Sequence, residues 1–172
     1  MQSQFGKPAS ARRSLPDNHG WLVSGSAAAI TSTLLLSLCG LIENGNPVGP
    51  NNGPSQWIYG RRSARRRRFS LRRTVPAYLI HHGSALFWSR LHQAMFVRDP
   101  PRPRTLQRCV AEGAVTAALA CFVDYRCTPR RLQPGFEQHL SRTSLFFVYA
   151  GCGTALGVAT YLLTHGRGRG SR

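Results

Sequence analysis

Acidic side chains are scarce in this sequence. Its 172 residues contain six Asp and Glu against 23 Lys and Arg, and the formal net charge is +17. No two of the acids have the spacing that would pair them on one face of a helix. No nucleophile, base and orienting group occur together at a recognisable spacing either. The sequence therefore predicts a protein that is not an enzyme.

Motifs that hold metals or phosphates are also missing. There is no C-x-x-C pair, and no glycine-rich loop is followed by Lys and Ser or Thr. The cysteines are odd in number, and Cys39, Cys121 and Cys152 lie well inside apolar stretches, where a small hydrophobic side chain is ordinary packing. We therefore expect no metal site, no disulfide and no cofactor.

Apolar residues are present in long blocks. Residues 21–42 run for 22 positions without a charge, and as a helix they would span about 33 Å, the thickness of a hydrocarbon core. Residues 145–163 form a second uncharged block. Two weaker blocks, residues 75–97 and 109–125, lie between them. The pattern predicts an all-α integral-membrane bundle of about four transmembrane helices, because soluble chains of this length rarely bury two such helices.

The segments outside these blocks are basic. The transmembrane domain at 21–163 is expected to lie between a basic N-terminal tail at 1–20 and a basic C-terminal tail at 164–172. Neutral blocks that alternate with cationic loops are typical of membrane proteins. The run at 21–42 is long for a cleaved signal and lacks a small-x-small exit, so we expect it to remain as an anchor.

The stretch RRSARRRRFSLRR at 61–73 contains eight arginines and no acid. It follows Trp57 and Tyr59, which suit the headgroup level, and precedes the apolar block at 75–97. We expect the cluster to contact phosphates of anionic lipids. Its members are Arg61, Arg62, Arg65, Arg66, Arg67, Arg68, Arg72 and Arg73. The Asn-, Gly- and Pro-rich residues 43–54 before it are expected to be an irregular connector.

A different class of function would use the same arginines. An arginine-rich nucleic-acid-binding protein, membrane-tethered or soluble, is the alternative interpretation. Stacking aromatics would favour it, but only Phe69 is interleaved with the arginines. Nucleic acid is therefore the less favoured partner.

Sidedness follows from the number of spans. With four spans, residues 43–73 and 126–143 share one side, while both termini and residues 98–108 share the other. The Lys and Arg totals differ little, but the eight arginines lie close to a span, where charge weighs most in topology. We expect this cluster to be cytoplasmic and the termini to lie outside.

Polar residues inside the blocks are expected to pair within the protein, because they are costly in lipid. They are His81, His82, His92, Glu112 and Asp124. On a helix the two adjacent histidines point about 100° apart, so they cannot chelate one ion. We expect the histidines to form hydrogen bonds between helices. For Asp124, near the end of its helix, we expect an ion pair with Arg130 or Arg131 in the following loop.

Small residues recur along one face of several blocks. Gly25, Gly113 and the pair Gly153 and Gly157 have the spacing of helix faces that approach closely. These faces favour a tightly packed bundle, and a homo-oligomer formed through them is a further expectation.

Three motifs together resemble those of a group of small, uncharacterised bacterial integral-membrane proteins. They are NNGPSQWIYG at 51–60, the tandem histidine in YLIHHGSALFW, and DYRCTPRRLQPGFEQHLS from Asp124. Gln56 stands where that pattern commonly has His. The resemblance implies a multi-pass protein of the bacterial inner membrane and attaches no activity to it. The expected function is a structural, scaffold or small-solute role.

Overall fold

The computed structural model describes residues 19–97 and 104–165 and contains four long helices. These are α1 (Gly20–Asn44), α4 (Leu71–His92), α5 (Leu106–Phe122) and α6 (Arg142–His165). The π-helical turns η2 (Gln93–Val97) and η3 (Val123–Cys127) continue α4 and α5. The shorter helices are η1 (Pro50–Ser55), α2 (Gln56–Tyr59), α3 (Arg61–Ala64) and η4 (Phe136–Gln138). The described residues form no strand, so the predicted all-α class is confirmed.

Three helical stretches are long and apolar enough to cross a membrane. They are Gly20–Asn44, Leu106–Cys127 and Arg142–His165. The block predicted at 75–97 is also helical, but α4 is not among these three in the described chain. Arg72, Arg73 and Arg90, together with its histidines, lower its hydropathy. A fourth span therefore stays a prediction.

The helix ends follow local sequence signals. Gly45 ends α1 with a φ of 65°, a left-handed conformation that glycine adopts without strain. Its N–H donates to the Leu41 carbonyl at 3.0 Å, and the next N–H donates to the Gly40 carbonyl at 3.0 Å. At the start of α5, the Thr105 side chain accepts a hydrogen bond from the Arg108 N–H at 3.2 Å.

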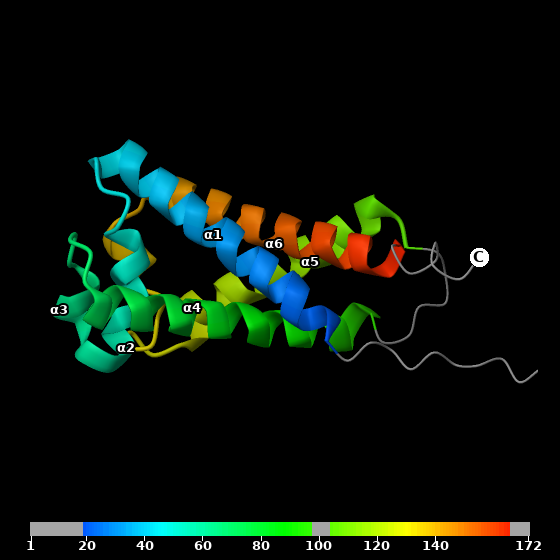
Figure 1. Cartoon of the computed structure of the whole chain (residues 1–172), viewed down its shortest axis with the longest axis horizontal. Helices are drawn as coiled ribbons and strands as arrows, with labels where there is room; N and C mark the ends of the chain where they lie inside the picture. Colours follow the sequence, from blue (N-terminus) through cyan, green and yellow to red (C-terminus); the bar gives the residue numbers. More distant parts are fainter. Residues whose placement is uncertain (1–18, 98–103, 166–172) are drawn as a thin grey trace, which may run out of the picture.

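The long helices run antiparallel in succession (Figure 1). α4 packs on α1, α1 on α6, and α6 on α5, while α4 and α5 contact each other only sparsely. The loop between α1 and α4 therefore meets the loop between α5 and α6 at one end of the bundle. The described chain ends lie at the opposite end (Figure 1).

Glycine allows the helix backbones to approach closely. A Cβ added to Gly113 of α5 would overlap the Gly153 carbonyl of α6 and lie 2.9 Å from the Gly157 nitrogen. On α1, a Cβ at Gly25 would lie 2.9 Å from side-chain atoms of Leu86 and Ser89 on α4. The small-residue faces identified in the sequence are thus where the helices meet, in the manner of membrane bundles.

Side chains are distributed with small and polar groups inside and large apolar groups outside. Ala28, Ala29 and Ser32 are almost completely buried in α1. Large apolar residues on every long helix are instead exposed, with exposed fractions up to 74% at Ile42 and 67% at Phe146. The larger buried apolar residues form a cluster of Leu36, Phe136, Leu140 and Val148. An apolar exterior of this extent needs an apolar environment or a partner.

The α5–α6 contact yields a prediction. Gly113→Ala should lower the free energy of unfolding by about 1 to 3 kcal/mol, because the new methyl group must push two helix backbones apart. Gly83→Ala is the matched control, since Gly83 lies in α4 with no atom within 4 Å of an added Cβ. It should be neutral or stabilise by up to about 1 kcal/mol. Thermal unfolding in detergent, followed by circular dichroism, measures both; equal effects would contradict the close contact.

Candidate functional site

The loop between α1 and α4 contains short helices, which corrects part of the expected irregular connector at 43–54. α1 continues to Asn44 and η1 begins at Pro50, while residues 45–49 between them are irregular. Hydrogen bonds of Asn52 explain why this loop is ordered. The Asn52 side chain is fully buried and donates to the carbonyls of Arg66 at 2.8 Å and Arg68 at 3.2 Å. The same side chain accepts from the Thr74 hydroxyl at 2.8 Å. The asparagine thus fixes the segment that contains the arginines.

Further amide and imidazole groups hold the backbone of the arginine cluster. Asn46 donates to the Arg67 carbonyl at 2.9 Å, and the His139 ring donates from Nε2 to the Ala64 carbonyl at 2.7 Å. Gln56 is fully buried, donating to the Gln133 carbonyl at 2.6 Å and accepting from Gln138 at 3.1 Å. These contacts join the two loops, so side chains on the inner side of the loops hold the backbone of the segment that contains the arginines.

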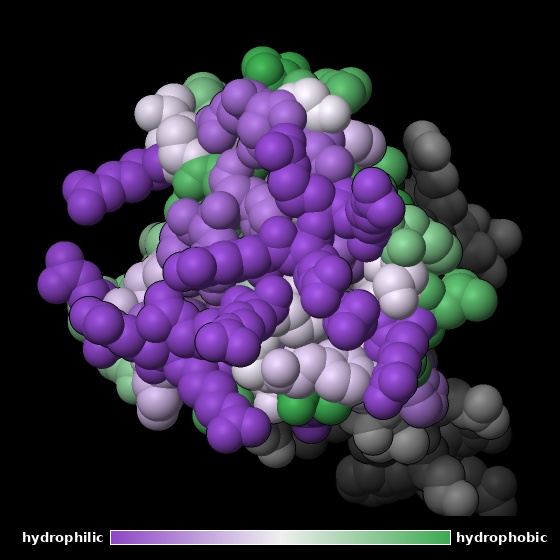
Figure 2. Space-filling view, turned by 90° about the vertical axis from the view of Figure 1, so that its left-hand side faces the viewer, coloured by the Kyte–Doolittle hydropathy of each residue, from purple (hydrophilic) through white to green (hydrophobic). Residues whose placement is uncertain are grey.

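The guanidinium groups point outward at this end. Arg61, Arg62, Arg65, Arg66, Arg67, Arg68 and Arg72 are exposed and Arg73 is half-buried. Hydrophilic side chains cover most of this end of the molecule (Figure 2). The structure thus brings all eight predicted arginines to the end where the two loops meet.

Three of these arginines line an open cleft of about 630 Å³. Arg61, Arg65 and Arg67 share it with Asn44, Glu137, Gln138 and His139. Arg65 donates from Nε to the Gln138 side chain at 3.3 Å, and Arg67 donates to the Asn44 carbonyl. Three cations face one acid, so this cleft suits an anion such as a phosphate. We call it the arginine cleft.

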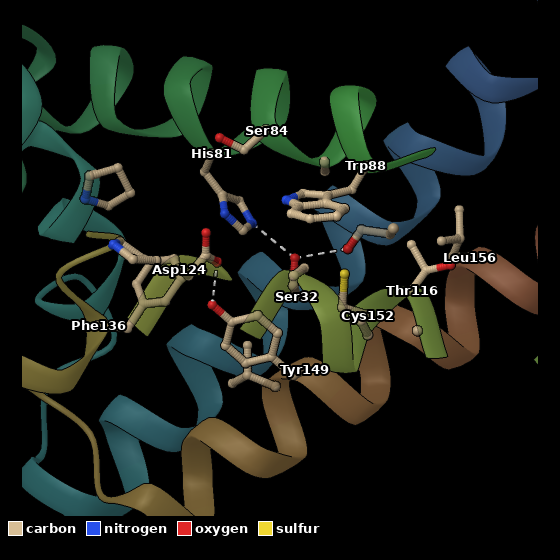
Figure 3. Close-up of a pocket in the computed structure, with 18 of the residues that line it drawn as sticks. Ser32, His81, Ser84, Trp88, Thr116, Asp124, Phe136, Tyr149, Cys152 and Leu156 are labelled. Carbon is tan, nitrogen blue, oxygen red and sulfur yellow. Dashed lines mark hydrogen bonds between the residues drawn. The ribbon is translucent and has the colours of Figure 1, made fainter. Parts of the chain in front are cut away.

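A second site is a cavity among the four long helices, mostly apolar but with several hydrophilic side chains in its lining, and we call it the polar cavity (Figure 3). Its volume is about 80 Å³. Polar groups reach it from every helix, with the loops contributing Trp57, Pro54, Pro134 and Phe136. The polar lining consists of Ser32 on α1, His81 and Ser84 on α4, Thr116 and Asp124 on α5 and η3, and Tyr149 and Cys152 on α6. Sequence reasoning identified His81 and Asp124 but missed their partners, since a lone Ser or Tyr in an apolar block is ordinary.

The three histidines of α4 form the predicted hydrogen bonds between helices. The His81 Nε2 lies 2.8 Å from the Ser32 hydroxyl and the His82 Nε2 lies 3.0 Å from the Ser26 hydroxyl, both on α1. His92 is almost completely buried, and its Nδ1 lies 2.8 Å from the Thr116 hydroxyl of α5. The histidines therefore fix α4 against its neighbours. Among the described residues, no group of three or more His, Cys, Asp or Glu side chains could hold a metal ion.

Glu112 has two cationic partners. Arg104 and Glu112 form a buried ion pair, and Arg108 donates from Nε to the same carboxylate at 2.9 Å. Arg104 also donates to the Phe96 carbonyl at 2.6 Å, which ties the start of α5 to η2. The spacing of Arg108 and Glu112, four residues apart on a helix, could have revealed that pair. Arg104 precedes the helix, so no periodicity marks it.

The ion pair predicted for Asp124 is wrong. The Tyr149 hydroxyl of α6 donates to Asp124 Oδ2 at 2.6 Å, and the salt bridges among the described residues do not include this acid. Arg130 and Arg131 are exposed in the loop. The carboxylate turns inward because η3 continues the helix past Phe122 and keeps Asp124 on the face that meets α6. Asp124 does lie near the end of its helix, but its partner is a hydroxyl group on the neighbouring helix and not a cation in the loop.

No protein-family model, curated protein or solved structure matches this chain. The resemblance read from its motifs therefore stays a prediction.

The new partner of Asp124 can be tested by double-mutant cycles. Asp124→Asn and Tyr149→Phe should be non-additive, with a coupling energy of about 1 kcal/mol, because each removes one side of the same hydrogen bond. Arg131→Gln should add independently to Asp124→Asn. The midpoints of thermal unfolding in detergent give these energies. Additivity of the first pair, or coupling in the second, would contradict the geometry.

Proposed function

We propose that this chain is a four-span membrane protein with a structural or scaffold role at an anionic membrane surface, where its arginine cleft binds lipid phosphates. The observation that carries the proposal is the distribution of side chains. Arginines gather at one end of a bundle whose sides expose large apolar residues. Apolar sides suit lipid tails, and a cationic end suits headgroup phosphates.

The fourth span is α4, and the positions of its polar side chains support this. Its three histidines face hydroxyl groups of neighbouring helices. Arg72 and Arg73 lie in its first turn and Arg90 in its last, near the two expected interfaces. Long cationic side chains at such positions reach the headgroup region. The low mean hydropathy of α4 is therefore compatible with a position among three more apolar helices.

The scaffold role follows from how the arginines are held. Hydrogen bonds from Asn46, Asn52 and His139 go to backbone carbonyls of the arginine segment. The segment is therefore ordered by neutral groups, and most of its guanidinium groups remain exposed for phosphate oxygens. Each cation near an anionic surface contributes about 1 kcal/mol. We propose the bacterial inner membrane as the location, which the motif resemblance implies.

Lipid contact predicts a selective effect of the cleft arginines. Full-length protein in maltoside detergent should bind phosphatidylglycerol more tightly than phosphatidylcholine. The Arg61, Arg65 and Arg67 to Gln variant should lose about tenfold in that affinity or more, since three cations are removed. The control changes Arg126, Arg130 and Arg131 to Gln, an equal change in charge outside the cleft. Titration with labelled lipid measures binding.

Two further titrations separate other ligands. Inorganic phosphate should compete weakly with the lipid, because a membrane surface supplies many phosphates at once. Tighter binding of single-stranded RNA than of phosphatidylglycerol would favour the nucleic-acid alternative. Equal losses in the two triple variants would show that no defined cleft exists.

Sidedness gives an independent prediction. A reporter that is active only outside the cytoplasm, fused after Arg172, should show strong activity, because the arginine cluster is retained in the cytoplasm. Changing Arg65, Arg66, Arg67 and Arg68 to Gln should lower that activity by weakening the topology signal. A silent fusion to the unmodified chain would place the termini in the cytoplasm and the cluster outside.

A further inference from the structure

The polar cavity is not needed for lipid contact at the arginine cleft. Its lining contains an acid but no base of the Arg or Lys type, although the chain as a whole is strongly basic. The acid is Asp124. The Tyr149 hydroxyl satisfies Oδ2, while the other carboxylate oxygen points away from Tyr149 toward the side of His81 (Figure 3). Asp124 is half-buried, and a carboxylate withdrawn from water without a cationic partner is costly unless a cation or a proton joins it.

Hydrogen bonds hold the His81 ring at the wall of the cavity. The Ser32 hydroxyl lies 2.8 Å from the Ala28 carbonyl, and the His81 Nε2 lies 2.8 Å from the same hydroxyl. The cavity therefore offers one carboxylate and one imidazole ring to a ligand.

Aromatic side chains form much of the remaining lining. Trp57, Trp88 and Phe136 line the cavity together with Tyr149. Aromatic faces attract ammonium groups, and this attraction is strongest where water is excluded. A volume of 80 Å³ holds on the order of five or more water molecules, which leaves room for an organic ion of a few heavy atoms.

The backbone at Asp124 is also unusual. The Thr128 N–H donates to the Val123 carbonyl at 2.9 Å, the spacing of a π-helical turn. Such turns inside or at the ends of α-helices recur at functional sites, where they redirect a side chain. Here the turn holds Asp124 on the cavity side of the helix.

We infer that the polar cavity binds a small organic ammonium cation, with Asp124 as its counter-ion and the aromatic lining as its walls. A hard metal ion is a poorer fit, because Ca²⁺ and Mg²⁺ require several oxygen ligands and only one carboxylate lines the cavity. An anion would meet the carboxylate. A neutral apolar ligand would suit only a protonated carboxyl group, and a neutral molecule of the same shape would then bind as well as the cation.

The test compares choline with 3,3-dimethyl-1-butanol, which has the same shape but carries carbon in place of the charged nitrogen. Full-length protein in maltoside detergent is titrated with each, and calorimetry and tryptophan fluorescence report binding. Choline should saturate a single site, and the neutral analogue should bind about tenfold more weakly or worse. Equal binding of the two, or no saturation by choline at millimolar concentration, would overturn the inference.

Two single variants test whether Asp124 is part of the choline-binding site. Asp124→Asn should reduce choline affinity by about tenfold or more, because the counter-ion is lost. Glu43→Gln is the matched control, since Glu43 is an exposed acid near the end of α1 that lines neither the cavity nor the arginine cleft. Glu43→Gln should leave choline affinity unchanged. An unchanged affinity in Asp124→Asn would overturn the assignment, and thermal unfolding checks that both variants are folded. The ligand comparison on the unmodified chain does not depend on either variant.

Free amines and lipid headgroups both carry an ammonium group. Repeating the titration with short-chain phosphatidylcholine separates these sources, since tighter binding of the lipid identifies a headgroup and tighter binding of choline a free amine. The arginine-to-glutamine variant of the arginine cleft should leave choline affinity unchanged. Failure of choline binding therefore leaves phosphatidylglycerol binding at that cleft untouched, and the two proposals fail separately.

Discussion

The close backbone contact between α5 and α6 is the interaction on which the rest of the structure depends. Gly113 meets Gly153 and Gly157 where no side chain fits between the helices. This close contact fixes the position of α5 along the axis of α6, so that the Tyr149 hydroxyl reaches the Asp124 carboxylate. α6 in turn packs on α1, and α1 on α4. Two narrow interfaces, one at Gly113 and one at Gly25, thus fix a row of four helices around a cavity.

Hydrogen bonds then supply the specificity that apolar burial cannot. Few large apolar side chains are buried between the helices, so little hydrophobic energy distinguishes one register from another. Ser24 and Ser89 lie 2.9 Å apart, and Ser32 bonds to His81 at 2.8 Å, each pair joining α1 to α4. A one-residue slip of α4 would break these bonds and leave polar groups unpaired, at a cost of about 1 to 3 kcal/mol each. Narrow glycine faces allow the approach, and the polar pairs select its register.

The sequence predicts the helices well and their neighbours less well. Length, hydropathy and small-residue spacing place the four long helices within a few residues, because these properties are local. The partner of Asp124 was predicted incorrectly, since the choice between Arg131 and Tyr149 depends on whether the helix continues through Val123–Cys127. The short helices in residues 50–64 were also not predicted, because they depend on hydrogen bonds that Asn52 and Gln56 make to residues distant in the sequence. Both incorrect predictions concern contacts between residues that are far apart in the sequence.

The two proposed sites are built partly from the same two loops, and this constrains how a cation could reach the cavity. Trp57 of α2 and Phe136 of η4 line the cavity, and the arginines of the cleft follow Trp57 in the same loop. A cation that approached through the arginine-covered end would be repelled, and screening reduces this repulsion only beyond about 8 Å at physiological ionic strength. α4 and α5 contact each other only sparsely, so a route between them would separate fewer packed residues. An ammonium group carried by a lipid could use that lateral route, whereas a free amine would have to pass either the apolar flank or the arginines.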